Sequence, residues 1–254
     1  MIGLSLLAAA AAMYTPAGKW TLDYQQDLCL LTRPFSAGGT KATLGFRQAP
    51  ADSQTEVIVL FADDPDSRLR RGFVIMKVGG LPVSTLSGAV SERVPGGHQR
   101  LLRFIAARDQ VAALATAPDV TIEVIGEQPL TFSLERGSAA LGALQTCEND
   151  QVASWGIDLS AVAKPAKAID PAKWLRFPLE AAANRRAGET TVRWTIDVTG
   201  RVSDCVVVRT SGTPILDKAA CTQVLQHGLY EPAIGKDGKP TPWIETRRIL
   251  WALG

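Results

Sequence analysis

Residues 191–198 read TVRWTIDV, and this strict alternation of apolar and polar side chains decides the fold of the C-terminal third of the chain. Side chains of a strand point alternately to its two faces, so the pattern predicts a half-buried strand with Val192, Trp194, Ile196 and Val198 on one face. Thr199-Gly200-Arg201 supplies the turn, because Gly200 can adopt positive φ. Residues 202–210 are expected to return as the second strand of a hairpin.

A helix is predicted after the hairpin. Thr213 can act as its N-cap, and Pro214 occupies the first helical position, where a missing N–H costs least. Asp217 in the first turn suits the helix dipole, and Gly228 is expected to end the helix after about His227. One stripe should pack on the hairpin, formed by Leu216, Ala220 and Val224 at positions i, i+4 and i+8.

Two further elements flank this unit. Residues 177–188 predict a short helix before the hairpin, and Trp243–Trp251 predicts a last strand. The region therefore reads as helix, hairpin, helix and final strand, which is an α+β arrangement.

Taken in order, the motifs of residues 173–254 resemble the C-terminal domain of TonB-type energy transducers. The motifs are Phe177-Pro178-x-x-Ala181 with Gly188, Val192-x-Trp194-x-Ile196-Asp197-x-x-Gly200-Arg201-Val202, Val206-x-Val208-x-x-Ser211-Gly212, Leu216-Asp217-x-Ala219-Ala220, Tyr230-x-Pro232-Ala233 and Gly238-Lys239-Pro240. The resemblance implies a small module that binds an extended peptide, the TonB box of outer-membrane receptors, by strand addition. Family members usually have Tyr before the first Pro, where this chain has Phe177.

The last strand is the expected docking edge. The candidate residues are Trp243, Ile244, Glu245, Thr246, Arg247, Arg248 and Ile249. Glu245, Arg247 and Arg248 could recognise charged residues of a docked strand. They could equally be charges that protect an exposed edge from aggregation.

The chain also departs from a full transducer of this family. Such a protein resembling the family would have an N-terminal membrane-spanning helix and a long proline-rich spacer, and we expect neither here. A periplasmic protein that binds an outer-membrane receptor segment or another extended peptide is the leading hypothesis. The alternative is a structural envelope protein that self-associates, with the same strand pairing across a homodimer.

The start of the chain is apolar. Residues 2–13 read IGLSLLAAAAAM, which as a helix covers about 18 Å where a bilayer core needs about 30 Å. This size, with its small residues, is typical of a signal peptide, and we expect residues 1–12 to be removed and the mature chain to have no membrane span. No Lys or Arg follows Met1, however, and a buried N-terminal helix is the alternative.

Four cysteines are expected to form two disulfides if the protein is exported. Three connectivities are open, and pairing within each half of the chain, Cys29 with Cys147 and Cys205 with Cys221, is the simplest. A zinc site is the competing interpretation, but the spacing of the cysteines and the two histidines does not favour it.

The region before residue 159 is predicted to be a β-rich domain, residues 13–158. Strands are expected at Trp20–Tyr24, Leu28–Thr32, Ala42–Gln48, Glu56–Ala62, Gly72–Val78, Val120–Ile125 and Pro129–Leu134, and helices at Ile105–Ala117 and Ser138–Cys147. With its early Trp20 and Cys29 it weakly resembles the invasion-associated locus B family of exported proteins. Residues 159–172, rich in Ala, Lys and Pro, are expected to be a linker to the domain at 173–254.

The composition points away from catalysis and nucleic-acid binding. The 254 residues include 27 Lys and Arg against 25 Asp and Glu, which gives no basic surface for nucleic acid. His98 lies in a Gly-rich loop and His227 at a helix end, and neither has a patterned partner. Asp63-Asp64-Pro65-Asp66 lacks the Gly and Glu of a calcium loop. We therefore expect no enzyme, no metal site and no cofactor.

Overall fold

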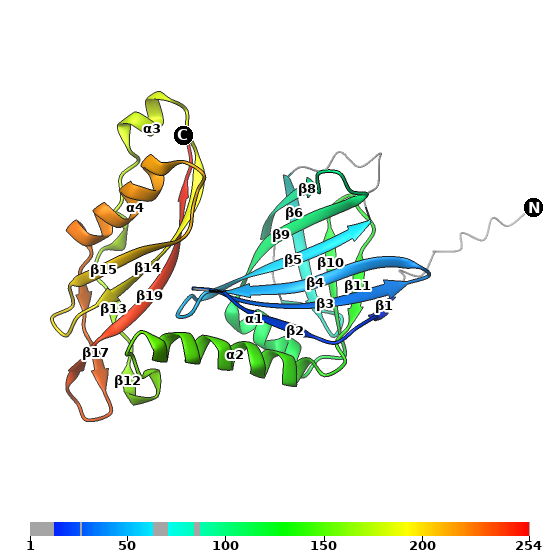
Figure 1. Cartoon of the computed structure of the whole chain (residues 1–254), viewed down its shortest axis with the longest axis horizontal. Helices are drawn as coiled ribbons and strands as arrows, with labels where there is room; N and C mark the ends of the chain where they lie inside the picture. The colour runs from blue at the N-terminus through cyan, green and yellow to red at the C-terminus, as the bar shows by residue number, and fades with distance from the viewer. Residues whose placement is uncertain (1–12, 26, 63–70, 84–86, 254) are drawn as a thin grey trace, which may run out of the picture. The chain divides into compact units, whose positions relative to one another are not determined.

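The computed structural model describes residues 13–25, 27–62, 71–83 and 87–253, and within them the chain forms two compact units (Figure 1). The first unit comprises Met1–Gln25, Cys29–Gln48 and Ser53–Gln145, and the second comprises Gln26–Leu28, Ala49–Asp52 and Thr146–Gly254. The expected signal peptide and the acidic turn at 63–66 lie outside the described residues.

The first unit is built round one sheet of eleven strands. The strands are β1 (Met13–Pro16), β2 (Thr21–Tyr24), β3 (Cys29–Ala37), β4 (Thr40–Gln48), β5 (Gln54–Ala62), β6 (Arg71–Val78), β7 (Leu81–Pro82), β8 (Ser87–Arg93), β9 (Gln99–Ala107), β10 (Asp119–Val124) and β11 (Leu130–Ser133). Strand β1 pairs with β11 in parallel and with β3 in antiparallel orientation, so the sheet closes on itself into a barrel (Figure 1). The remaining pairings described are antiparallel.

Alternate side chains fill the interior of this barrel. On β9 every second residue from Arg100 to Ala106 is buried, while the residues between them are partly exposed. Phe35 and Phe132 pack edge to face in the interior with their ring centroids 5.1 Å apart. The buried Arg33 donates hydrogen bonds to two backbone carbonyls, which satisfies part of its polar head.

One expectation for the first unit is wrong. The helix expected at Ile105–Ala117 is shorter, since β9 continues to Ala107 and only α1 (Arg108–Ala112) and the single turn η1 (Ala113–Ala115) follow. Leu102, Phe104 and Ala106 alternate into the barrel core, so a period of two overrides the helical spacing seen further on. Strands β1, β7, β8 and β9 were also not expected.

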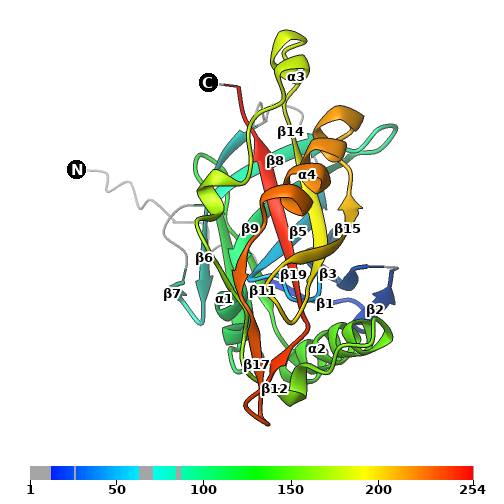
Figure 2. The same ribbon diagram turned by 90° about the vertical axis from the view of Figure 1, so that its left-hand side faces the viewer.

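The second unit carries the elements of the predicted C-terminal domain and more. They are the end of α2 (Gly137–Ser154), η2 (Leu159–Ala161), β12 (Val162–Lys164), β13 (Lys167–Ala168), η3 (Pro171–Lys173), α3 (Leu179–Ala183), β14 (Gly188–Ile196), β15 (Val202–Arg209), α4 (Pro214–His227), β16 (Tyr230–Glu231), β17 (Ala233–Gly235), β18 (Pro240–Thr241) and β19 (Trp243–Trp251). A three-stranded sheet has the order β15-β14-β19. Helix α4 lies across one face of it (Figure 2).

The hairpin turn has two local causes. The Asp197 carboxylate accepts hydrogen bonds from the backbone N–H groups of Thr199 and Arg201 at 2.8 and 3.0 Å. Hydrogen bonding by Thr199 and Arg201 lowers the pKa of Asp197. Gly200 has φ 83°, and a Cβ there would lie 2.0 Å from the carbonyl oxygen of Tyr230. Glycine is therefore required both for the conformation and for the space.

Helix α4 has the predicted bounds, but its ends differ in detail. Thr213 holds the N-cap position without a side-chain capping bond, and Asp217 instead accepts a hydrogen bond of 2.8 Å from the backbone N–H of Ser211. Gly228 ends the helix at φ −63°, so positive φ is not the reason for a glycine. A Cβ at Gly228 would lie 2.5 Å from the carbonyl oxygen of Val224, and space is the reason. The predicted stripe is buried, namely Leu216, Ala220 and Val224.

Residues 159–172, expected as a linker, are folded into the second unit. Strand β12 pairs Val162 with Gly235, and β13 pairs Lys167 with Glu231. The α+β class holds for the chain as a whole, whereas the closed barrel was not expected. None of the helices in the described ranges has the length and apolar content needed to cross a bilayer.

Candidate functional site

Strand β19 is one of the two edges of the three-stranded sheet, and β15 is the other. It pairs with β14 residue for residue over nine positions, from Trp243 opposite Ile196 to Trp251 opposite Gly188, without a register shift. Strand β14 pairs with β15 on its other side, and within the described residues β19 ends the strand order, so no strand pairs with its outer side. Alternate residues of such an edge turn N–H and C=O groups away from the sheet, which makes β19 a template for a further strand.

The side chains of β19 divide between two packed faces. Trp243, Ile249 and Trp251 belong to the core under α4, which also contains Leu216. On the other face Ile244 is fully buried against residues at the end of α2 and the turn after it. Leu250 is the exception, because its side chain is 74% exposed. Both faces are thus largely covered, while no strand in the described part of the chain pairs with the outer backbone edge.

A polar network lies on the α4 side of the strand. The Glu245 carboxylate accepts hydrogen bonds from Arg247 and from the Tyr230 hydroxyl, which in turn accepts one of 3.0 Å from the indole N–H of Trp194. The Arg247 guanidinium lies 5.8 and 6.0 Å from the ring centroids of Trp174 and Trp194. Burial, aided by the Glu245 charge, raises the pKa of Tyr230, so its hydroxyl stays protonated.

Two polar residues paired across the strands face the other way. Arg193 on β14 is opposite Thr246 on β19. The Thr246 hydroxyl donates a hydrogen bond of 2.6 Å to the carbonyl of Pro50. The Arg193 guanidinium lies 3.3 Å from the Asp27 carboxylate and 4.0 Å from the ring centroid of Trp155. The middle of the sheet is therefore fixed from its back face by residues far away in sequence.

Residues 174–253 match the family described as Gram-negative bacterial TonB protein C-terminal. They form a TonB-type C-terminal domain. The chain is also similar to the C-terminal domain of TonB from Pseudomonas aeruginosa solved by NMR, at 22% identity over 35% of this chain and 86% of that one, with a TM-score of 0.29. No curated protein matches the chain. The likeness of the first region to the invasion-associated locus B family stays a prediction.

Within the TonB-type domain, the seven predicted edge residues have different surroundings. Ile244, Thr246 and Ile249 are buried, and Trp243, Glu245, Arg247 and Arg248 are partly exposed. Each of the three charges has a partner, because Glu245 binds Arg247 and an Arg248 guanidinium nitrogen lies 3.6 Å from a Glu189 carboxylate oxygen. The i, i+2 spacing of Glu245 and Arg247 was a usable signal for their pairing, since such residues share a strand face. Nothing local pointed to Leu250 or Arg193.

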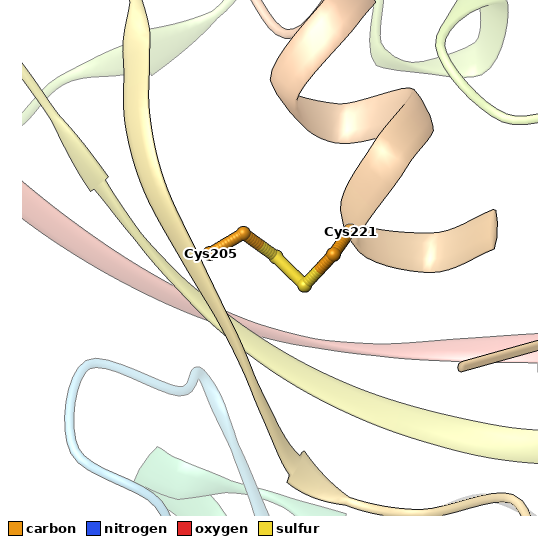
Figure 3. Close-up of a disulfide and its surroundings, with 2 residues drawn as sticks. All are labelled: Cys205 and Cys221. Carbon is orange, nitrogen blue, oxygen red and sulfur yellow. A yellow bond between two sulfur atoms is a disulfide. The ribbon is translucent and has the colours of Figure 1, made fainter. Parts of the chain in front are cut away.

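A disulfide connects the TonB-type sheet to its helix. Cys205 on β15 and Cys221 on α4 are bonded, with their Cα atoms 5.5 Å apart (Figure 3). Cys205 is opposite Trp194 in the hairpin, which places it on the face under α4. Cys29 and Cys147 are also disulfide-bonded and buried, so the chain contains no free thiol.

Both histidines weighed for catalysis are exposed. His227 is the last residue of α4 and is exposed, and His98 lies in an exposed bend before β9. A depression of about 590 Å³ at the end of α2 is lined partly by Asp150 and Asp158. The Asp158 carboxylate accepts hydrogen bonds from the hydroxyl and the backbone N–H of Ser160, which lower the pKa of Asp158 and give the carboxylate a structural role. In the described ranges no three His, Cys, Asp or Glu residues gather as metal ligands.

Proposed function

We propose that the TonB-type domain binds an extended peptide by strand addition at the outer edge of β19. The partner we propose is a segment of an outer-membrane receptor, because domains of this family interact with such receptors. Main-chain hydrogen bonds would supply the affinity and side-chain contacts along the edge the specificity.

One observation carries this proposal: β19 is packed on both faces, and among the residues that the structure describes no strand pairs with its outer edge. Nine residues in unbroken register with β14 span about 30 Å at the usual rise per residue of a strand. This length accommodates a peptide of several residues. An exposed Leu250 on this edge offers apolar contact to a docked side chain.

The proposed location is the periplasm of a Gram-negative cell. All four cysteines are in disulfides, and structural disulfides persist in exported proteins but are rare in a reducing cytosol. The apolar start of the sequence, which has the size of a signal peptide, also supports export. Detection of the mature chain in a periplasmic extract, with residues 1–12 removed, would test this part of the proposal.

Docking can be tested by NMR on the ¹⁵N-labelled full chain. A synthetic TonB-box peptide is titrated to millimolar concentration, and we expect concentration-dependent shifts confined to amides of β19 and its surroundings. Leu250→Lys should weaken binding several-fold, since it removes an apolar contact from the edge. Leu179→Lys is the matched control, because Leu179 is 88% exposed and lies outside β19. An absence of shifts in β19 would overturn the proposal.

Self-association is the second candidate. Two copies could pair their β19 edges across a two-fold axis, since the same edge then meets itself. The exposed leucine on an edge strand favours this alternative as well, because edges are commonly protected by charges. Sedimentation of the full chain would show a dimer that Leu250→Lys dissociates, and a monomer at high concentration would exclude it.

A further inference from the structure

The back face of the docking sheet contains a buried polar pair that the docking proposal does not use. Arg193 and Thr246 are 8% and 3% exposed and lie opposite each other in the β14–β19 ladder. Within the described residues, the buried Nε of Arg193 has no hydrogen-bond partner. Buried polar groups that are incompletely satisfied cost stability, so their presence calls for a reason beyond stability.

The partners of this pair come from two short turns. Asp27 lies in the turn between β2 and β3, and Pro50 in the turn between β4 and β5. Both turns belong to the second unit. With Trp155 under the Arg193 guanidinium, these five residues form what we call the back-face clamp.

We propose that the back-face clamp positions β19 for docking, with Arg193 and Thr246 as its positioning residues. This inference rests on the proposed function, because it concerns how tightly the outer edge of β19 captures a peptide. Thr246 is near the middle of β19, and its hydroxyl holds that point of the strand against the Pro50 carbonyl. The clamp acts from the face, so it leaves the outer backbone edge open to a new strand.

The physical argument is one of pre-organisation. An edge strand is held by its ladder on one side only, and a peptide that docks on a mobile edge must order that edge first. A strand fixed at its centre avoids much of this cost, so the clamped form binds the peptide more tightly. Coupling of this kind is reciprocal, and a docked peptide should in turn strengthen the clamp.

Substitutions at Thr246 test the clamp in the full chain, because Asp27 and Pro50 are absent from a fragment limited to residues 173–254. Thr246→Val keeps the shape and strand preference but removes the hydroxyl. We expect this variant to bind the TonB-box peptide about 3–10-fold more weakly than the wild type does. We also expect faster hydrogen–deuterium exchange of β19 amides without peptide. Thr246→Ser restores the hydroxyl and should recover both. Thr195→Val is the control, since Thr195 shares this face of β14 and has no hydroxyl hydrogen bond within the described chain.

The outcomes separate this inference from the docking proposal. If the wild-type chain binds the peptide and Thr246→Val binds it equally well, the clamp is overturned while docking stands. If the wild-type chain does not bind, the exchange data decide, and unchanged exchange of β19 in Thr246→Val overturns the positioning role. Asp27→Asn removes the negative charge that pairs with Arg193 in the clamp. Like Thr246→Val, it should weaken binding of the peptide.

Discussion

The indole nitrogen of Trp194 donates a hydrogen bond of 3.0 Å to the hydroxyl of Tyr230, which lies 36 residues further along the chain. Both side chains are almost completely buried, at 1% and 2% exposure. The bond joins β14 to β16 under α4, and the Tyr230 hydroxyl continues to the Glu245 carboxylate on β19. The core of the TonB-type domain is thus connected by polar contacts to the candidate docking strand.

Removing the Tyr230 hydroxyl should destabilise the domain. Tyr230→Phe leaves the Trp194 N–H buried without its acceptor, and we expect the free energy of unfolding to fall by about 1–3 kcal/mol. Urea denaturation followed by tryptophan fluorescence measures the change. The double variant Trp194→Phe/Tyr230→Phe completes the cycle, and its loss should be smaller than the sum of the two single losses. Additive losses would contradict a direct coupling.

Two glycines with positive φ should differ sharply in their tolerance of alanine. At Gly200 a Cβ would lie 2.0 Å from a backbone oxygen, whereas at Gly238, with φ 79°, no atom lies within 4 Å. Gly238→Ala should therefore lower the free energy of unfolding by about 1 kcal/mol, because only the positive φ is unfavourable for alanine. Gly200→Ala must also displace Tyr230 and should lose clearly more stability by chemical denaturation. Equal losses would mean that the hairpin adjusts freely.

The Asp217 carboxylate should make the stability of the domain depend on pH. Burial raises the pKa of Asp217, but hydrogen bonds from Thr210, Ser211 and Thr190 outweigh burial and hold it below the usual value. A lowered folded-state pKa gives stability that is complete above the unfolded value of about 3.9 and is lost as pH falls through the folded pKa.

Asp217→Asn provides the measurement for this pH dependence. At pH 7 the variant should be less stable than the wild type by about 1–2 kcal/mol, because the charged acceptor is lost. The difference in urea midpoint should shrink as the pH is lowered from 5 to 3. A difference that stays constant over this range would show that the Asp217 charge contributes nothing.

Local patterns explain why the C-terminal domain could be predicted from sequence. The predicted bounds of α4 and β19 agree with the structure. The signals for both elements come from residues close together in sequence: an apolar stripe between two cap positions for the helix, and a run bounded by turns for the strand. Gly200 was identified as the turn glycine for the same reason. The closed barrel could not be found this way, since its closure depends on Tyr14 pairing with Phe132 and Thr15 with Ser36.

The candidate site shows the same division. The edge strand itself was predicted, and so was the presence of charges on it. The contacts that fix β19 were not, because Thr246 and Pro50 are 196 residues apart and no local pattern connects them. The charges were expected to face a partner or solvent, whereas Glu245 is engaged by Arg247 and Tyr230 within the domain.

The disulfide between β15 and α4 should contribute substantially to the stability of the TonB-type domain. It closes a loop with a sequence separation of 16 residues, and restricting a loop of that length in the unfolded chain is worth about 3 kcal/mol. Cys205→Ala/Cys221→Ala should therefore lose about that free energy of unfolding in urea, while α4 stays folded by circular dichroism. Val207→Ala on the same strand is the control and should cost less than about 1 kcal/mol, because the Val207 side chain is exposed. A loss in the double variant no larger than in this control would show that packing of α4 on the hairpin, and not the bond, holds the helix in place.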